Sequence, residues 1–259
     1  MSKLVVVSGT GLEKLVKDSA KTKEVKTPFG SATIIEGKLA GRELLYISRH
    51  GPAHDLLPHE INYRANMFAA LENGGTHVLS IAAVGTVTPE RFLKKGYRPG
   101  DIAMVRDILI QSGLPSAFDA KELRCADMHT PMGQPFSMDF INLIISASEK
   151  VNIYVKNYEK KAVLADPSGP WFETKADIIK LQRDGANFVG MTSTKETLAL
   201  RELAHADARF ERKNATLVIV TNYGTGLSVK EHDHKEVGRM VQKREQDVIT
   251  IVTQVLDML

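Results

Sequence analysis

Two short stretches of this sequence place anion-binding groups directly after an apolar run. SGTGL (8–12) follows LVVV and offers a glycine-rich turn whose backbone N–H groups can approach an anion, with the hydroxyl of Thr10 beside them. SRHG (48–51) supplies Arg49, which can hold an oxyanion through two parallel hydrogen bonds, and His50, which can donate another. A plain turn explains the first stretch equally well, and a surface ion pair with a capping histidine explains the second.

In two later stretches, an apolar run ends in residues with small or hydroxyl-bearing side chains. SIAAVGT contains Ala82 and Ala83, whose side chains are so small that a ligand can rest on the backbone and take an N–H from it. VGMT ends in Thr192, at the start of an expected helix whose free N–H groups favour an anion. Tight packing and ordinary helix capping are the competing explanations.

A second group of residues suits a flat heterocycle rather than an anion. In SGPWFET, Phe172 offers a face for stacking, and Glu173 can accept a hydrogen bond from a ring N–H. Asn222 ends the apolar run TLVIVT and is followed by glycine-rich positions, so its amide can read a ligand at the mouth of a sheet. Taken singly, Phe172 also fits a core, Glu173 a helix start, and Asn222 a turn.

The elements that must position these groups alternate along the chain. Short apolar runs without strict alternation are typical of strands buried on both faces, and we expect strands at 4–9, 31–39, 42–48, 77–83, 101–109, 153–165, 187–192 and 216–222. Amphipathic segments predict helices at 59–75, 174–185 and 193–206, and from about His234 onward. Thr174 with Asp177 forms a variant of the capping box. This order predicts a single α/β domain over residues 1–259, with a mixed central sheet flanked by helices and ligands beyond the carboxyl ends of strands.

Composition disfavours several classes of protein. The 259 residues are 43% hydrophobic and 25% charged, as in an ordinary soluble protein. The net charge of +3 comes from scattered basic residues with acidic neighbours, so no nucleic-acid groove is expected. No apolar run reaches the roughly 18 residues of a membrane helix, and the N-terminal run is too short for a signal peptide. The single cysteine, Cys125, fits a reducing, cytoplasmic setting.

The sequence holds no convincing metal or dinucleotide pattern. His50, His54 and His59 have the spacing H-x3-H-x4-H, but no carboxylate or cysteine completes a recognisable zinc site. The glycine turn at 8–12 lacks the third glycine of a dinucleotide fingerprint, because that position is Lys14.

Taken in order, these motifs resemble one known family over about residues 5 to 255. SGTGL, SRHG…PHEINYRAN, HVLSIAAVG, MHTPMGQPF, GPWFET, VGMT…LRE and TNYGTGL together resemble the trimeric purine nucleoside phosphorylases and methylthioadenosine phosphorylases. The combination of GP-x-FET with VGMT is specific. That family cleaves the N-glycosidic bond of purine nucleosides with inorganic phosphate and releases the purine and a ribose 1-phosphate. The resemblance therefore implies a pentosyltransferase of purine salvage, with phosphate as co-substrate and with no metal or organic cofactor.

The resemblance also implies roles for individual residues. It implies that phosphate is bound by Thr10, Arg49, His50, the backbone of Ala83 and Thr192. It implies that the base and sugar are surrounded by Ala82, Phe172, Glu173, Met191 and Asn222. The MHTPMGQPF segment reaches a neighbouring subunit's site in that family, with His129 as the candidate residue. This implies a homotrimer, or a hexamer of two trimers.

Two positions bear on which nucleoside is cleaved. The methylthioadenosine branch has an Asp at the position of Asn222, whereas an amide suits a 6-oxopurine: its NH2 can donate to O6 and its carbonyl can accept from a protonated N7. Glu173 can accept the N1 proton, which adenine lacks. His234 matches the histidine that contacts the 5′-hydroxyl, although it lies in a polar run that also fits a solvent-exposed helix start. We therefore expect phosphorolysis of inosine and guanosine, with the preference between hypoxanthine and guanine left open.

Several alternatives stay open. A phosphorylase of S-methyl-5′-thioinosine would share Asn222 but need an apolar 5′ pocket, and one of S-methyl-5′-thioadenosine would contradict this interpretation of Asn222. A nucleosidase using water is disfavoured by the anion-binding residues. A nucleoside-binding protein without catalysis is conceivable, because segment 101–113 departs from the family pattern, with Arg106 and Asp107 where an Asp-Gln pair is usual.

Overall fold

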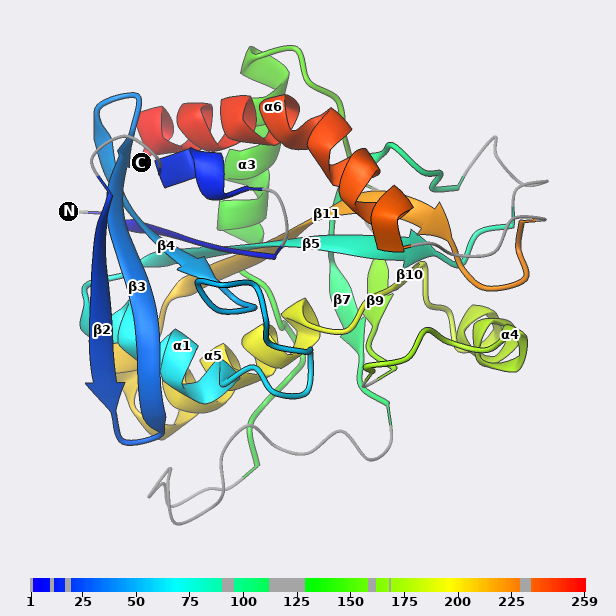
Figure 1. Cartoon of the computed structure of the whole chain (residues 1–259), viewed down its shortest axis with the longest axis horizontal. Coiled ribbons are helices and arrows are strands. Elements are labelled where there is room, and N and C mark those ends of the chain that lie inside the picture. Colours follow the sequence, from blue (N-terminus) through cyan, green and yellow to red (C-terminus); the bar gives the residue numbers. More distant parts are fainter. Residues whose placement is uncertain are drawn as a thin grey trace.

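The computed structural model describes residues 2–9, 12–16, 20–89, 96–111, 129–157, 162–167, 169–228 and 234–259. These residues form one mixed sheet of eleven strands with helices on both sides, as the sequence predicted (Figure 1). The strands are β1 (Leu4–Ser8), β2 (Lys21–Thr27), β3 (Gly30–Leu39), β4 (Arg42–Ser48), β5 (His77–Thr86), β6 (Ile102–Met104), β7 (Asp107–Leu109), β8 (Val155–Lys156), β9 (Val163–Ala165), β10 (Phe188–Val189) and β11 (Lys213–Tyr223). The α-helices are α1 (Tyr63–Glu72), α3 (Met138–Lys150), α4 (Lys175–Arg183), α5 (Ser193–Ala206) and α6 (His234–Met258), and short 3-10 turns occur at Glu13–Val16 and Ala208–Phe210.

The centre of the sheet is parallel. β1 pairs in parallel with β4 on one edge and with β5 on the other, and β5 pairs in parallel with β11. All five residues of β1 are buried, because helices cover both faces of the sheet. The near-continuous apolar runs of the sequence reflect this two-sided burial. Since parallel strands end at one edge of the sheet, the segments after β1, β4, β5 and β11 come together there.

The two faces of the sheet have separate cores. Leu4 and Val6 of β1 pack in a cluster with residues of α3 and α6, whereas Val5 and Val7 pack in a cluster with residues of α1 and α5. Successive side chains of a strand point to opposite faces, so one strand contributes to both cores. In Figure 1, α3 and α6 lie on one side of β5 and β11, and α1 and α5 lie on the other.

Two predicted strands are each divided in the structure. The run 101–109 forms β6, which pairs with β11 and β8, and then β7, which pairs with β9. Between them, Val105 N donates to Thr216 O over 2.9 Å and Arg106 N donates to Ala162 O over 2.8 Å, so the chain passes from one neighbour to another. The run 153–165 likewise yields β8 and β9. Apolar character alone does not show where a chain changes its pairing partner.

One strand and one helix were not predicted. β2 (KTKEVKT) is polar and largely exposed, and it forms through antiparallel pairing with β3 as an edge strand. Its lysines are typical of exposed edges. Helix α3 buries Phe140, Ile141, Ile144 and Ala147, a helical spacing that was present in the sequence.

The other helices agree with the prediction to within a few residues. α5 spans the predicted 193–206, and α6 begins at His234. α1 is shorter than the predicted 59–75, because Asn62 caps it by accepting from Ala65 N. Among the residues described, no helix is both long enough and apolar enough to cross a membrane.

The capping box of α4 gives a test of this local structure. Thr174 accepts from Asp177 N over 3.2 Å, and Thr174 N donates to the Asp177 carboxylate over 2.9 Å. Replacing Thr174 with Ala removes the side-chain cap, and we expect a loss of about 1 kcal/mol in the free energy of unfolding, measured by urea denaturation. Thr174→Ser keeps the hydroxyl and should retain most of the stability. Equal losses in both variants would contradict this role of the cap.

Candidate functional site

A cavity of about 470 Å³ opens where the strand ends meet. Most of the residues that the sequence analysis proposed for a site line it, namely Arg49, His50, Ala82, Ala83, Phe172, Glu173, Met191, Thr192 and Asn222. They come from segments that are up to 173 residues apart in the sequence, from Arg49 to Asn222. The fold thus brings the anion-binding group and the heterocycle-binding group into one cavity.

Three proposed residues are not placed in this cavity. Thr10 lies outside the described residues, although its neighbour Gly9 lines the cavity. The backbone of His234 begins α6, but its side chain lies outside the described part of the chain. His129 is exposed and does not line the cavity, so its proposed role in a neighbouring subunit remains a prediction.

The edge of β5 explains where the cavity forms. β11 pairs along one edge of β5 from His77 to Thr86. On the other edge, β1 pairs only as far as Ile81, and β10 begins opposite Gly85. Among the described strands, none pairs with that edge between those two points. Of the intervening residues, Ala83 directs its backbone N–H and C=O to this open edge, because successive residues of a strand alternate between edges and Val84 O accepts from Thr221 of β11. Ala83 is also exposed in an otherwise buried stretch.

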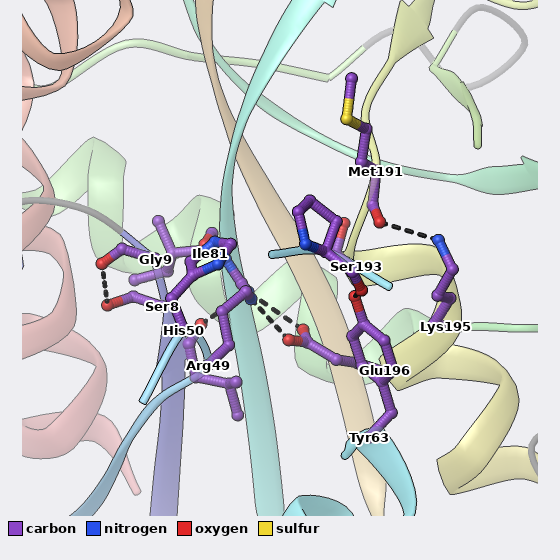
Figure 2. Close-up of polar contacts among 12 residues, drawn as sticks. Ser8, Gly9, Arg49, His50, Tyr63, Ile81, Met191, Ser193, Lys195 and Glu196 are labelled. Atoms are coloured by element: carbon purple, nitrogen blue, oxygen red, sulfur yellow. Dashed lines mark hydrogen bonds and ion pairs between the residues drawn. The ribbon is translucent and has the colours of Figure 1, made fainter. Parts of the chain in front are cut away.

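Arg49 lies on the wall of this cavity and is almost fully buried, with 2% of its surface exposed. Its Nε and Nη2 donate to the two carboxylate oxygens of Glu196 over 2.6 and 3.0 Å. Nη2 also donates to Val7 O over 3.1 Å, and Nη1 donates to Ile81 O over 2.8 Å. Figure 2 shows Glu196 of α5 meeting Arg49 across the sheet.

This arrangement differs from the role that the sequence analysis expected for the Arg49 guanidinium. The two parallel hydrogen bonds that the sequence analysis assigned to an oxyanion are made to Glu196, a residue to which it gave no role. Nη1 lies on the cavity side, since a Cβ on Gly9 would be 3.4 Å from it. A guanidinium has five N–H groups, so one N–H of Nη1 is available in addition to the four hydrogen bonds described.

His50 has a fixed ring orientation at the same wall. Its Nδ1 is 2.8 Å from Leu56 O, so the neutral ring donates from Nδ1 and carries its lone pair on Nε2. Burial lowers the pKa of His50, and the charge of Arg49 lowers it further, although the bond to Leu56 opposes the shift. A Cβ on Gly9 would be 3.4 Å from Nε2, so the glycine keeps this nitrogen accessible. Towards an anion, His50 acts as a donor only when it is protonated.

The first residue before α5 faces the cavity without capping the helix. Thr192 occupies the N-cap position, and its side chain makes no capping hydrogen bond. The alternative that its hydroxyl serves as an ordinary cap is therefore wrong for this helix. The 14-residue helix that follows directs its unpaired N–H groups and the positive end of its dipole towards this part of the cavity.

A bulge in β11 aims Asn222 at the opposite end of the cavity. The register with β5 shifts between Val220 and Asn222, which leaves Thr221 as the extra residue. The Thr221 hydroxyl donates to Asn222 Oδ1 over 2.7 Å, and Asn222 Nδ2 donates to Tyr223 O over 2.9 Å. These bonds fix which end of the amide is oxygen. Gly85 lies beside it, since a Cβ there would be 3.1 Å from Nδ2.

Phe172 and Glu173 follow β9 on the other side of Asn222. Glu173 is 5% exposed, and its Oε1 accepts from Thr225 N over 3.2 Å, so the loop after β11 orients the carboxylate. Phe172 is 42% exposed and lines the cavity. Met191 packs against Gly169 of this segment. A Cβ added to Gly169 would lie 2.8 Å from the Met191 sulfur.

No site for a metal is evident in the described part of the chain. His50 and His54 are in ring contact, with centroids 4.9 Å apart, but no group of three or more His, Cys, Asp or Glu side chains there could hold a metal ion. The expectation that the chemistry needs neither metal nor cofactor stays a prediction.

Comparison with known proteins agrees with this arrangement. The chain is 31% identical to a 6-oxopurine nucleoside phosphorylase of Pyrococcus furiosus, over 97% of this chain and 91% of that protein. It is 33% identical to a probable S-methyl-5′-thioinosine phosphorylase of Xanthomonas campestris, over 86% of this chain and 84% of that protein. A methylthioadenosine phosphorylase from Schistosoma mansoni, solved in complex with adenine, shares the fold with a TM-score of 0.82 at 23% identity, covering 100% of this chain and 92% of that one.

The family is shown by a match along nearly the whole sequence. Residues 3–257 match the phosphorylase superfamily, and the two relatives above are named as nucleoside phosphorylases. The resemblance noted from the motifs is thereby confirmed. From its sequence and its fold, the chain belongs to the phosphorylase superfamily and is a nucleoside phosphorylase, an enzyme of the pentosyltransferase class.

Proposed function

We propose that this enzyme transfers the ribosyl group of 6-oxopurine nucleosides, such as inosine and guanosine, to inorganic phosphate. The observation that supports this best is that one cavity is lined by two groups of residues, which we assign to its two ends. One group consists of Nη1 of Arg49, the exposed backbone at Ala83 and the α5 N-terminus, and the other consists of Asn222 and buried Glu173. The names of the Pyrococcus and Xanthomonas relatives agree with this substrate class.

The first end suits a phosphate dianion. Nη1 of Arg49, the backbone N–H of Ala83 and the hydroxyl of Thr192 are the donors that we assign to the phosphate at the cavity wall. The lone pair on Nε2 of His50 suits the remaining P–O–H group of HPO4²⁻, which a sulfate ion lacks. Phosphate held there lies under the sugar and is oriented for attack on C1′. Thr10 is proposed to add a hydroxyl from the turn after β1.

The second end suits the departing base. Breaking the glycosidic bond leaves positive charge on the sugar, which the phosphate stabilises, and negative charge on the purine. We propose that Oδ1 of Asn222, which accepts from Thr221, also accepts a proton from N7 of the bound base, and that Nδ2, which donates to Tyr223 O, also donates to O6. Glu173 can accept the N1 proton while one oxygen stays bound to Thr225 N. These groups are fixed before reaction, so stabilising the leaving base requires little reorganisation.

The assembly and location are further parts of this proposal. We expect a homotrimer, or a hexamer of two trimers, in which the exposed His129 meets the cavity of a neighbouring subunit. We also expect a cytoplasmic enzyme that requires phosphate but no metal and no organic cofactor.

A second candidate substrate is S-methyl-5′-thioinosine. Val237 and Val241 of α6 line the cavity, together with Leu12. They follow His234, the residue proposed to bind a 5′-hydroxyl, by one and two helical turns. An apolar wall at this point favours a methylthio group, as the name of the Xanthomonas relative suggests for that protein. The base-recognition argument is the same for both candidates.

A panel of nucleosides separates the candidates. We expect phosphate-dependent release of free base from inosine and guanosine, followed by chromatography of the products, and slower release from adenosine and methylthioadenosine. A kcat/KM for methylthioinosine above that for inosine would identify the second candidate. Base release in phosphate-free buffer would instead identify a nucleosidase, and tight inosine binding without release would identify a binding protein.

Asn222→Asp tests the recognition of the base. A carboxyl at this position cannot donate from an NH2 to O6, so we expect the ratio of kcat/KM for inosine to that for adenosine to fall by about 100-fold. The substitution keeps the shape of the side chain but removes the bond from Nδ2 to Tyr223 O, so we expect a modest fall in melting temperature with the enzyme still folded at the assay temperature. An unchanged ratio would contradict the role assigned to Asn222.

Gly85→Ala tests the positioning of the same amide. The new methyl group would lie 3.0 Å from Val189 Cγ1 and 3.1 Å from Asn222 Nδ2, so it pushes the amide out of place. We expect kcat/KM for the best nucleoside to fall by about tenfold or more. Gly238→Ala in α6 is the matched control, since no atom lies within 4 Å of a Cβ there and Gly238 does not line the cavity. Equal activity in the two variants would refute the proposed crowding.

A further inference from the structure

Lys195 is a buried cation that does not line the cavity and has no role in the chemistry above. Its Nζ donates to both carboxylate oxygens of Asp166, over 2.9 and 2.8 Å, and to Met191 O over 2.8 Å. An ammonium group has three hydrogens, so these three bonds occupy all of them. Asp166 is fully buried, at 0% exposure.

These three bonds join two neighbouring segments that both line the cavity. Asp166 follows β9 and begins the segment that leads to Phe172 and Glu173. Met191 follows β10 and precedes Thr192 at the start of α5. Strands β9 and β10 pair over only two residues each, and the backbone pairing continues to the bond from Gly190 N to Ala165 O, at 3.0 Å.

We propose that Lys195 is a positioning residue for the base. By holding Asp166 and the Met191 carbonyl together, it sets the spacing between the segment that carries Phe172 and Glu173 and the segment that carries Met191. Figure 2 shows Lys195 reaching back along α5 to the Met191 carbonyl, on the side of the helix away from the Arg49–Glu196 pair. This inference rests on the proposed function, because it assigns the base to that end of the cavity.

The position of the Lys195 link predicts whether its removal affects binding of the nucleoside or of phosphate. Arg49 and His50 follow β4 and are held by Glu196, Val7, Ile81 and Leu56. None of these contacts passes through Lys195. Thr192, which is also proposed to bind phosphate, directly follows Met191, whereas Arg49 and His50 keep all of their contacts. Loosening the link should therefore weaken binding of the nucleoside much more than binding of phosphate.

The chain offers a matched control pair. Lys156 Nζ lies 2.6 Å from the Asp101 carboxylate and donates to a backbone carbonyl, that of Gly96, over 3.0 Å. Its side chain is 14% exposed, against 16% for that of Lys195. Each ammonium also lies over a tyrosine ring, at 5.8 Å for Lys156 and 5.9 Å for Lys195. Lys156, Asp101 and Gly96 do not line the cavity.

The test uses double variants, because removing Lys195 alone would leave a buried carboxylate uncompensated and could prevent folding. Lys195→Met with Asp166→Asn removes both charges together with the link to Met191. We expect the KM for the nucleoside to rise by about tenfold while the KM for phosphate stays within about twofold. Lys156→Met with Asp101→Asn should change neither value.

A binding measurement separates positioning from turnover. Trp171 is the only tryptophan of the chain and is 66% exposed beside Phe172, so its fluorescence reports binding of free hypoxanthine without reaction. The dissociation constant should rise in the Lys195 double variant by the same factor as the KM for the nucleoside.

Several outcomes would overturn the inference. These are unchanged nucleoside KM and hypoxanthine affinity, a rise confined to the KM for phosphate, equal effects in the two double variants, or a Lys195 double variant that is unfolded at 25 °C by circular dichroism. Failure of the proposed function looks different, because the wild-type enzyme would then release no base from any 6-oxopurine nucleoside.

Discussion

The parallel pairing of β5 with β1 and β11 is the constraint on which the rest of this structure depends. It brings the carboxyl ends of these strands, and that of β4, to one edge of the sheet. The pairing of β1 with β5 ends at Ile81, and the pairing of β10 with β5 begins at Gly85. On this edge, the short length of β5 between these points keeps its backbone groups free for a ligand. The cavity is therefore a consequence of unequal strand lengths, and Ala82 and Ala83 are small because they form its floor.

Charges around this cavity are compensated within the chain. Arg49 is paired with Glu196 and Lys195 with Asp166, while burial disfavours the charged form of His50 by lowering its pKa. Single buried charges would be costly, and removing one partner of such a pair is more damaging than removing both. The phosphate that we propose at this wall would consequently be held by oriented N–H groups and by the α5 N-terminus rather than by a net positive charge. Fixed dipoles of this kind need no rearrangement as charge develops in a reaction.

Helix α5 links the two ends of the cavity. Thr192 precedes it, Lys195 binds the Met191 carbonyl, and Glu196 binds Arg49, all within its first turn. One rigid element thus fixes a residue proposed to bind phosphate and a residue proposed to contact the base. This arrangement explains why a polar first turn is buried in a protein whose other helices bury mainly apolar side chains.

The sequence by itself determined the fold class and the family, and most of the residues that it pointed to for a site do line the cavity. Two-sided burial leaves continuous apolar runs, and the motifs at the strand ends retain their order, so β1, β5, β11 and the first residues of α5 could be located from local pattern. The tertiary structure decided what depends on partners distant in the chain. Pairing divided the run 101–109 between two neighbours, and pairing with β3 made a strand of the polar segment β2. The partner of Arg49 is Glu196, 147 residues away, and that of Lys195 is Asp166, which no spacing rule connects. A local pattern records which side chains prefer burial or a helix, whereas the choice of partner is made only when the strands align.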